Sequence, residues 1–296
     1  MTARVDKVGI IDVGSNSVRC AVFSCGKPCF KKLITSRLGE GVFNGLLSEA
    51  AVERTVNAVC ELVALAREHG AESIYVFATE AVRRAKNAEI FTSAVNRRVG
   101  LSVDVVDGKT EAQLAIDGAL GDGDGCVIDL GGASTEIVVR LRGEIVYAFS
   151  VGVGAVVLSD VCGRDKSKLT AYIAQKCREF GEVPMVNNVV AVGGTATSIA
   201  ACSLRLSKYD PSVVHGAKLT VQELDRLIGR FGGMTAEEIA TEYPVDGRRA
   251  EIIFGGAILL KHALLCAGGQ SLTVSESDNL EGYYRRLAKG DRENER

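Results

Sequence analysis

The sequence contains the same short pattern twice, and this repetition constrains the fold more than any other feature. The first copy, IIDVGSNS, covers residues 10–17, and the second, CVIDLGGAS, covers residues 126–134. In both copies an apolar run ends in an aspartate, followed by one apolar residue, a glycine and small or polar residues. Such a turn between two apolar runs is typical of a β-hairpin. Because Asp12 and Asp129 are 117 residues apart, about one domain length, the repeat predicts a duplicated fold.

The remaining patterns predict a mixed α/β chain of two domains. Helical spacing of apolar residues predicts a helix over Glu49–Glu68, and Ser48 is a suitable N-cap for it. The glycine-rich segment 121–125 is the best boundary, so we expect one domain over residues 1–120 and another over 121–296, with the final helix able to pack back on the first. Further helices are expected at 88–99, 110–119 and 196–206, and strands at 8–13, 18–24, 29–38, 73–78, 102–106, 135–141, 144–150 and 189–192.

Composition and charge exclude several classes of protein. Hydrophobic residues make up 47% of the chain and charged residues 24%, which suits a globular protein with packed cores. The chain has 35 basic and 37 acidic residues, a net charge of −2, so bulk attraction to a polyanion is absent and we expect no nucleic-acid partner. No apolar run approaches the roughly 18 residues that span a membrane, so we expect no membrane association either.

The nine cysteines argue against a zinc site. They form no Cys-x-x-Cys pair, and the three histidines are scattered along the chain. Most lie inside apolar runs. We therefore expect reduced, mainly buried thiols in a cytoplasmic protein.

The two repeated turns are suited to binding phosphate. Glycine lets consecutive backbone N–H groups point at an anion, and small polar side chains add donors. An aspartate at the end of the strand can hold Mg²⁺ directly or through water. A tight hairpin turn explains either copy alone, whereas two copies one domain apart favour phosphate binding. The candidate phosphate-binding residues are Ser15, Asn16 and Ser17 in the first turn, Gly131, Gly132, Ala133 and Ser134 in the second, and Gly193, Gly194 and Thr195 at a weaker strand-to-helix turn.

Several motifs, in their order and spacing, resemble the exopolyphosphatase/guanosine pentaphosphate phosphohydrolase (Ppx/GppA) family of the actin, sugar-kinase and heat-shock ATPase superfamily. The resemblance implies an α/β fold with two ribonuclease-H-like (actin-like) domains, in which helices flank mixed sheets and the active-site cleft lies between the domains. The motifs cover nearly the whole chain: IDVGSNSVR at 11–19, RLGEG at 37–41, ATEAVRRAKN at 78–87, GKTEAQL at 108–114, IDLGGASTE at 128–136, VGGTATS at 192–198, VHG at 214–216 and the segment 275–282.

The resemblance also implies roles for single residues. Glu111 matches the catalytic base of the family, although a glutamate early in a helix is by itself only a favourable partner for the helix dipole. Asp129 and Glu136 match acidic positions associated with a divalent metal, Mg²⁺ or Mn²⁺, and Asp12 is their counterpart in the first domain. Arg83 matches an arginine that binds phosphate.

Two other arginines are expected to have different roles. Arg84 follows Arg83 directly and is expected in solvent, because adjacent helical residues point about 100° apart. A structural ion pair on the second strand is one interpretation of Arg19.

The chain departs from the family pattern in two ways. Ala133 stands in a loop where the family more often has a third glycine, and its methyl group disfavours a positive φ. The resemblance also leads us to expect a short form of the family, since longer relatives continue into a C-terminal helical domain.

From these residues and the resemblance we expect a hydrolase, a metal-dependent exopolyphosphatase that releases orthophosphate from the end of short inorganic polyphosphate. The alternatives are a guanosine pentaphosphate 5′-phosphohydrolase and, more distantly, a superfamily kinase or a non-catalytic sensor of polyphosphate or nucleotide. The expected partners are the small-molecule substrate and a second copy of the chain in a homodimer.

Overall fold

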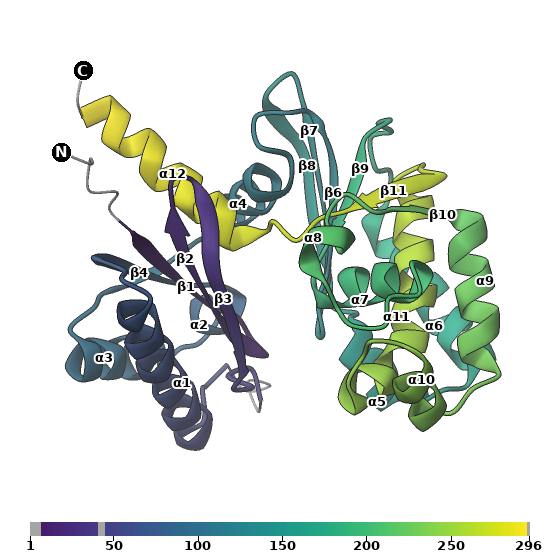
Figure 1. Ribbon diagram of the computed structural model, residues 1–296, viewed down its shortest axis with the longest axis horizontal. Coiled ribbons are helices and arrows are strands. Elements are labelled where there is room, and N and C mark those ends of the chain that lie inside the picture. Colours follow the sequence, from purple (N-terminus) through teal and green to yellow (C-terminus); the bar gives the residue numbers. More distant parts are fainter. Residues whose placement is uncertain (1–6, 41–44, 295–296) are drawn as a thin grey trace. The chain divides into compact units, whose positions relative to one another are not determined.

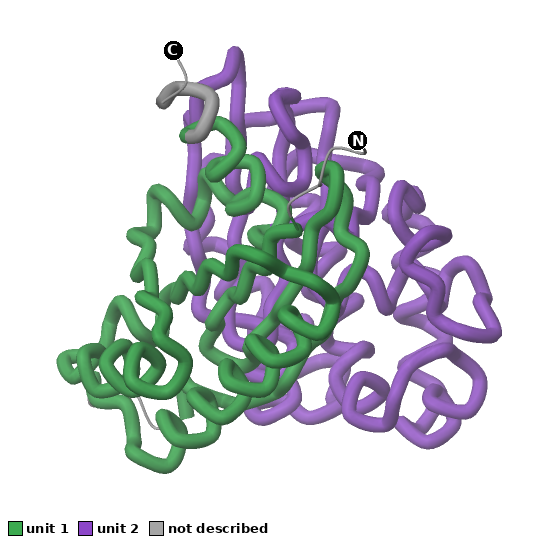
Figure 2. The backbone as a smooth tube through the Cα atoms, turned by 60° about the vertical axis from the view of Figure 1, so that its left-hand side comes forward, with its two compact units in different colours: residues 1–114, 279–296 green, residues 115–278 purple. Residues whose placement is uncertain are grey.

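A computed structural model describes residues 7–40 and 45–294 of the chain, so Gly41, the last residue of the RLGEG motif, lies outside the described residues (Figure 1). The chain forms two compact units (Figure 2). Unit 1 consists of residues 1–114 and 279–296, and unit 2 consists of residues 115–278.

A five-stranded mixed sheet forms the centre of unit 1, in the order β3-β2-β1-β4-β5. The first three strands are antiparallel neighbours, and the last two run parallel to β1. The strands are β1 (Val8–Val13), β2 (Ser17–Ser24), β3 (Lys27–Thr35), β4 (Ser73–Ala78) and β5 (Val103–Val105).

Both faces of this sheet are covered, because side chains on successive strand residues alternate between two apolar layers. Ile11 and Val13 pack in the layer formed with α1 (Glu49–Glu68) and α3 (Ala88–Val99). Ile10 belongs to the opposite layer, which contains residues of α4 (Gly108–Leu120) and α12 (Asn279–Asn294). In that second layer, Tyr283 of α12 stacks on Phe77 of β4 with ring centroids 4.6 Å apart.

The strand ends bring two loops of unit 1 together. Val13 is paired with Ala78 at the carboxyl ends of the parallel strands β1 and β4. The Thr79 N–H continues this pairing by donating to the Val13 carbonyl over 3.2 Å, and the short helix α2 (Glu80–Arg83) begins one residue later. The turn after β1 and the segment with Arg83 therefore lie at the same edge of the sheet.

Unit 2 contains a six-stranded sheet in the order β10-β11-β9-β6-β7-β8. The strands β6, β7 and β8 are antiparallel neighbours, and β9 and β11 run parallel to β6. The bounds are β6 (Gly125–Leu130), β7 (Thr135–Leu141), β8 (Glu144–Val151), β9 (Val189–Val192), β10 (Lys218–Thr220) and β11 (Ser271–Val274).

The helices of unit 2 pack around α11, whose central residues are buried. Ala257, Ile258, Leu259 and Leu260 of this helix are all at most 4% exposed. The helices are α5 (Ala155–Cys162), α6 (Lys166–Cys177) with the following 3-10 turn η2 (Arg178–Phe180), α7 (Gly194–Ser203), α8 (Pro211–Val214), α9 (Val221–Gly232), α10 (Ala236–Glu242) and α11 (Gly247–Cys266).

The duplication expected from the sequence extends through both sheets. The order β8-β7-β6-β9-β11 of unit 2 repeats the order β3-β2-β1-β4-β5 of unit 1, with the same parallel and antiparallel neighbours. The predicted fold class, two mixed-sheet domains flanked by helices, is therefore confirmed. Among the described residues, no helix is both long enough and apolar enough to cross a membrane.

Candidate active site

The turn between β1 and β2 is closed by a backbone hydrogen bond. The Gly14 N–H donates to the Ser17 carbonyl over 3.0 Å, and the Gly39 N–H donates to the Ser15 carbonyl over 2.7 Å. Asn16, at the tip, is exposed, and its side-chain amide donates to the Ser17 hydroxyl. The residues predicted to bind phosphate thus form an ordered, accessible loop at the edge of the sheet.

The equivalent turn of unit 2 has the same geometry. The Gly131 N–H donates to the Ser134 carbonyl, again over 3.0 Å. The loop packs closely against the residue before α5. A Cβ on Gly154 would come within 2.4 Å of the Gly132 carbonyl oxygen. The first helical N–H groups of α5 donate to this loop, since Val156 N donates to the Gly132 carbonyl over 2.9 Å.

Ala133 fits the second loop without strain. The backbone φ of Ala133 is not positive. Among the described residues, the non-glycine residues with a positive φ are Cys25, Arg37, Arg142 and Arg205. Its side chain is exposed. An alanine can therefore replace the third glycine because this backbone does not need left-handed geometry.

The aspartates that precede these turns have opposite kinds of neighbour. Asp12 lies directly across the β1–β2 pair from Arg19, whose Nε donates to Asp12 Oδ2 over 3.1 Å. Asp129 lies directly across the β6–β7 pair from Glu136. Residues directly opposite in an antiparallel pair have side chains on the same face of the sheet. Unit 1 therefore has an ion pair where unit 2 has two carboxylates.

The carboxylates of unit 2 lie beside a third loop. β9 is parallel to β6, so Val192 is paired with Asp129 and the turn that follows, Gly193-Gly194, adjoins it. Gly193 has φ +94°, and a Cβ there would come within 3.0 Å of Asp129 Oδ1 and 2.8 Å of the Leu130 carbonyl oxygen. Only glycine permits this close approach. Thr195, predicted as a phosphate ligand, has a buried side chain, which leaves its backbone N–H at the start of α7 as the group suited to an anion.

Arg249 lies beside this third loop, and its position there was not predicted from the sequence. The guanidinium of Arg249, in the first turn of α11, lies so near Gly194 that a Cβ on that glycine would come within 2.6 Å of Nη2. Burial lowers the pKa of Arg249, although an arginine stays charged at any pH of interest. No local signal separates Arg249 from its neighbour Arg248, because packing of α11 against α7 sets its position.

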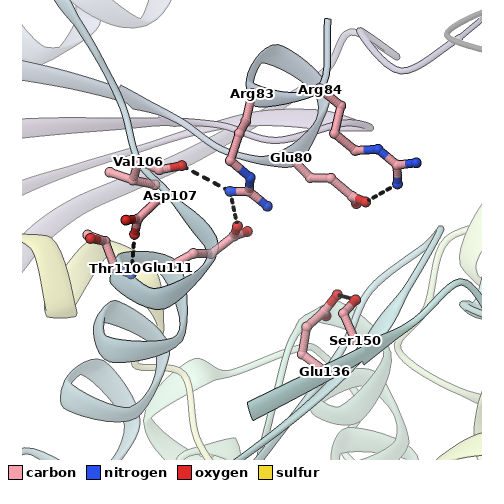
Figure 3. A network of polar contacts seen from close by, with 9 residues as sticks. All are labelled: Glu80, Arg83, Arg84, Val106, Asp107, Thr110, Glu111, Glu136 and Ser150. Carbon is pink, nitrogen blue, oxygen red and sulfur yellow. Dashed lines mark hydrogen bonds and ion pairs between the residues drawn. The ribbon is translucent and has the colours of Figure 1, made fainter. Parts of the chain in front are cut away.

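In unit 1, Glu111 and Arg83 form the second polar feature at the edge of the sheet (Figure 3). Glu111 lies in the first turn of α4, and Arg83 Nη1 donates to its Oε2 over 2.7 Å. The same Nη1 donates to the Val106 carbonyl over 2.9 Å, which fixes the guanidinium. Both side chains are about a quarter exposed, 29% for Arg83 and 26% for Glu111, so a ligand can reach them.

The electrostatic surroundings of Glu111 favour its protonated form. Burial raises the pKa of this carboxyl above its usual value, and the negative charges of Asp12 and Glu80 raise it further. The hydrogen bond and positive charge of Arg83 act in the opposite direction. A carboxylate with a raised pKa is a stronger base than an ordinary glutamate once it is ionised.

Arg83 and Arg84 separate as expected from their adjacent positions. Arg84 points away from Glu111, is 71% exposed and pairs with Glu80 one helical turn earlier over 2.9 Å. Figure 3 shows the two guanidinium groups on different partners. Arg83 alone is therefore placed beside the candidate base.

The donor set of unit 2 fits Mg²⁺. Within residues 7–40 and 45–294 no cluster of three or more histidine, cysteine or acidic side chains is arranged around a common point. Mg²⁺ does not need such a cluster, because it keeps several waters and binds through one or two carboxylates and substrate phosphates. Asp129 and Glu136 supply two carboxylates on one face, and the Ser150 hydroxyl orients Glu136 through a 2.6 Å hydrogen bond.

Comparisons with known proteins identify the family of this chain. The sequence pattern of the Ppx/GppA phosphatase family matches residues 27–288. Exopolyphosphatase 2 of Mycobacterium tuberculosis is 29% identical to this chain, over 95% of this chain and 98% of that protein. Exopolyphosphatase 1 of the same organism is 28% identical, over 95% of this chain and 88% of that protein.

A solved structure shares the fold over almost its whole length. The crystal structure of the Aquifex aeolicus Ppx/GppA family member superposes with a TM-score of 0.81 and is 29% identical, covering 97% of this chain and 99% of that one. The match of the family pattern to most of the sequence is decisive. The chain therefore belongs to the Ppx/GppA phosphatase family and is a hydrolase of phosphoanhydrides.

Proposed function

We propose that this protein is a magnesium-dependent exopolyphosphatase that removes the terminal phosphate from short inorganic polyphosphate. The observation that carries the proposal is the ion pair between Arg83 and Glu111. Glu111 is a partly exposed carboxylate that can act as a base, and the guanidinium beside it is a group that binds phosphate well. Relatives that are exopolyphosphatases support the choice of substrate.

In this proposal Glu111 accepts a proton from the water that attacks the terminal phosphorus, and the P–O bond to the rest of the chain breaks. Arg83 holds an oxygen of the terminal phosphate and opposes the rise in the pKa of Glu111 that burial causes. Backbone N–H groups and small polar side chains of the three loops bind further phosphate oxygens. These loops are Ser15–Ser17, Gly131–Ser134 and Gly193–Thr195, and Arg249 adds a cation beside the third.

Asp129 and Glu136 are the residues proposed to hold the metal. When bound, Mg²⁺ supplies positive charge that stabilises the phosphate oxygens as the anhydride breaks. Asp12 is given a different role, because its carboxylate is already paired with Arg19. We assign Asp12 to orienting Arg19 at the first loop and to raising the pKa of Glu111.

Short chains are the proposed substrates because the sequence contains no long run of basic residues. Its net charge is −2, and its paired cations are dispersed, as at Lys31-Lys32, Arg97-Arg98 and Arg285-Arg286. A polymer with about one charge per phosphate needs a continuous cationic surface to stay bound between cleavages. We therefore propose distributive action, in which the substrate is released after each phosphate.

The test is orthophosphate release from polyphosphates of defined length, guanosine pentaphosphate and ATP, each with magnesium and with a chelator. The proposal expects magnesium-dependent release, with the highest kcat/KM on a short polyphosphate. A higher kcat/KM on guanosine pentaphosphate would assign that substrate instead. Transfer of labelled phosphate from ATP to a small acceptor, without release into water, would assign a kinase.

A further inference from the structure

Two cysteines from distant parts of the sequence meet at one end of unit 2. Cys177 is the last residue of α6, and Cys266 is the last residue of α11. The Cys266 thiol donates to the Cys177 carbonyl oxygen over 3.9 Å, so the two side chains lie next to each other. The helices α6 and α11 pack against each other, so this proximity is fixed by the core of unit 2.

The two thiols differ in their access to solvent. Cys177 is buried, at 5% exposure, whereas Cys266 is partly exposed. The hydrogen bond from Cys177 lowers the pKa of Cys266, while the same contact and burial raise the pKa of Cys177. Cys266 is therefore the more acidic and more accessible thiol, and Cys177 is a buried thiol next to it. The nearby phenol, Tyr147, remains neutral because burial raises its pKa to about 12.

We propose that Cys177 and Cys266 form a reversible disulfide when the protein meets a hydroperoxide, with Cys266 as the thiol that reacts first and Cys177 as the resolving thiol. This modification site is independent of phosphate hydrolysis, since neither residue belongs to the candidate active site.

The chemistry balances with the peroxide as the only oxidant. The Cys266 thiolate attacks one peroxide oxygen, the O–O bond breaks, and the other oxygen leaves as hydroxide and takes up a proton to become water. Cys266 is then a sulfenic acid. The Cys177 sulfur attacks the sulfur of Cys266, the S–O bond breaks, and the thiol proton joins the departing hydroxide as a second water. Two thiols are oxidised by two electrons, and one hydroperoxide is reduced.

The proximity of Cys177 to Cys266 is what makes the second step fast. The ends of α6 and α11 already hold the two side chains next to each other, and the disulfide requires the sulfurs to come to ~2.05 Å. Cys25 and Cys29 are the contrasting case, because both are exposed on the β2–β3 hairpin and so are more accessible than Cys266. If exposure alone governed oxidation, these two would react first.

The test is titration of the folded full-length chain with hydrogen peroxide, followed by blocking of free thiols and peptide mass spectrometry without reduction. We expect a peptide pair cross-linked through Cys177 and Cys266 at a peroxide concentration at least tenfold below that which oxidises Cys25 or Cys29. Dithiothreitol should restore both thiols. Oxidation of Cys25 and Cys29 before any such cross-link forms would overturn the proposal.

Two variants separate the roles of the thiols. In Cys177→Ala, Cys266 should stop at the sulfenic acid and form a dimedone adduct several-fold more abundant than in the unchanged protein. In Cys266→Ser, Cys177 should stay reduced because it is buried. Cys60→Ser is the matched control, since Cys60 is also partly exposed and should leave the cross-link unchanged. Equal dimedone labelling with and without Cys177 would contradict the resolving role.

Discussion

Asp129 on β6 lies directly across from Glu136 on β7, and the two carboxylates share one face of the sheet. Like charges in this position repel each other, so the arrangement is favourable only with a cation nearby. The equivalent position in unit 1 pairs Asp12 with Arg19. The duplicated fold thus has an ion pair at this position in one unit and two carboxylates in the other.

The change Glu136→Gln should weaken magnesium binding at this site. Glutamine keeps an oxygen that can accept from Ser150 but removes one charge, so the magnesium concentration for half-maximal activity should rise about 10- to 100-fold. Glu144→Gln, at the exposed start of β8, is the control and should leave this magnesium concentration unchanged. An unaltered magnesium dependence in Glu136→Gln would remove Glu136 from the metal site.

The change Arg19→Met should destabilise the protein, because it leaves the carboxylate of Asp12 buried without its partner. Breaking a buried ion pair in this way costs about 3 kcal/mol of unfolding free energy, at the low end of the usual range because Arg19 is 25% exposed. Urea unfolding in the absence of metal measures this loss of unfolding free energy. The double variant Asp12→Asn/Arg19→Met should recover most of the loss, and a double variant as unstable as Arg19→Met would contradict this account.

The activity of the enzyme should fall on acidification at a pH above the ordinary glutamate range. Glu111 must be ionised to accept a proton, and burial raises its pKa above 4.5, so the acid limb of kcat/KM should lie above pH 4.5. Arg83 lowers this pKa, so in Arg83→Met the limb should move to higher pH. A limb that stays in place or moves to lower pH in that variant would contradict the role given to Arg83.

The change Gly193→Ala should impair both stability and activity. The new methyl group would meet the Leu130 carbonyl and the Asp129 carboxylate in a backbone that has φ +94°. Displacing Asp129 should lower kcat/KM by about 100-fold. Gly143→Ala is the matched control, because Gly143 has φ +80° and open space around it, so only the backbone cost of about 1 kcal/mol should remain. Equal losses in the two variants would show that contact with Asp129 does not matter.

Local signals account for the parts of the fold that the sequence predicted well. The helix Glu49–Glu68 and the strand Ser73–Ala78 have the expected bounds, and Ser48 caps the helix by accepting from the Ala51 N–H over 3.2 Å. Caps and periodic apolar residues act over a few neighbours, so a single sequence contains them.

The unpredicted features depend on contacts between distant residues. The segment 121–125 resembles a flexible hinge in sequence, yet Arg140 of β7 donates to the carbonyls of Gly121 and Gly123 and to Asp117, which holds the segment against unit 2. Arg249 likewise reaches Gly194 only through the packing of α11. Neither contact can be predicted from the residues that neighbour it in the sequence.

The most direct test of the account is the rate of orthophosphate release from a short polyphosphate by Glu111→Gln. The amide keeps the shape of the side chain but cannot accept a proton, so kcat should fall about 100- to 10,000-fold while substrate binding changes only a few-fold. The melting temperature at neutral pH should not fall, because the raised pKa of Glu111 means that its ionised form opposes folding there. Glu89→Gln, in the first turn of α3, controls for the loss of a helix-dipole partner. A kcat within tenfold of the unchanged enzyme would contradict the assignment of Glu111 as the base.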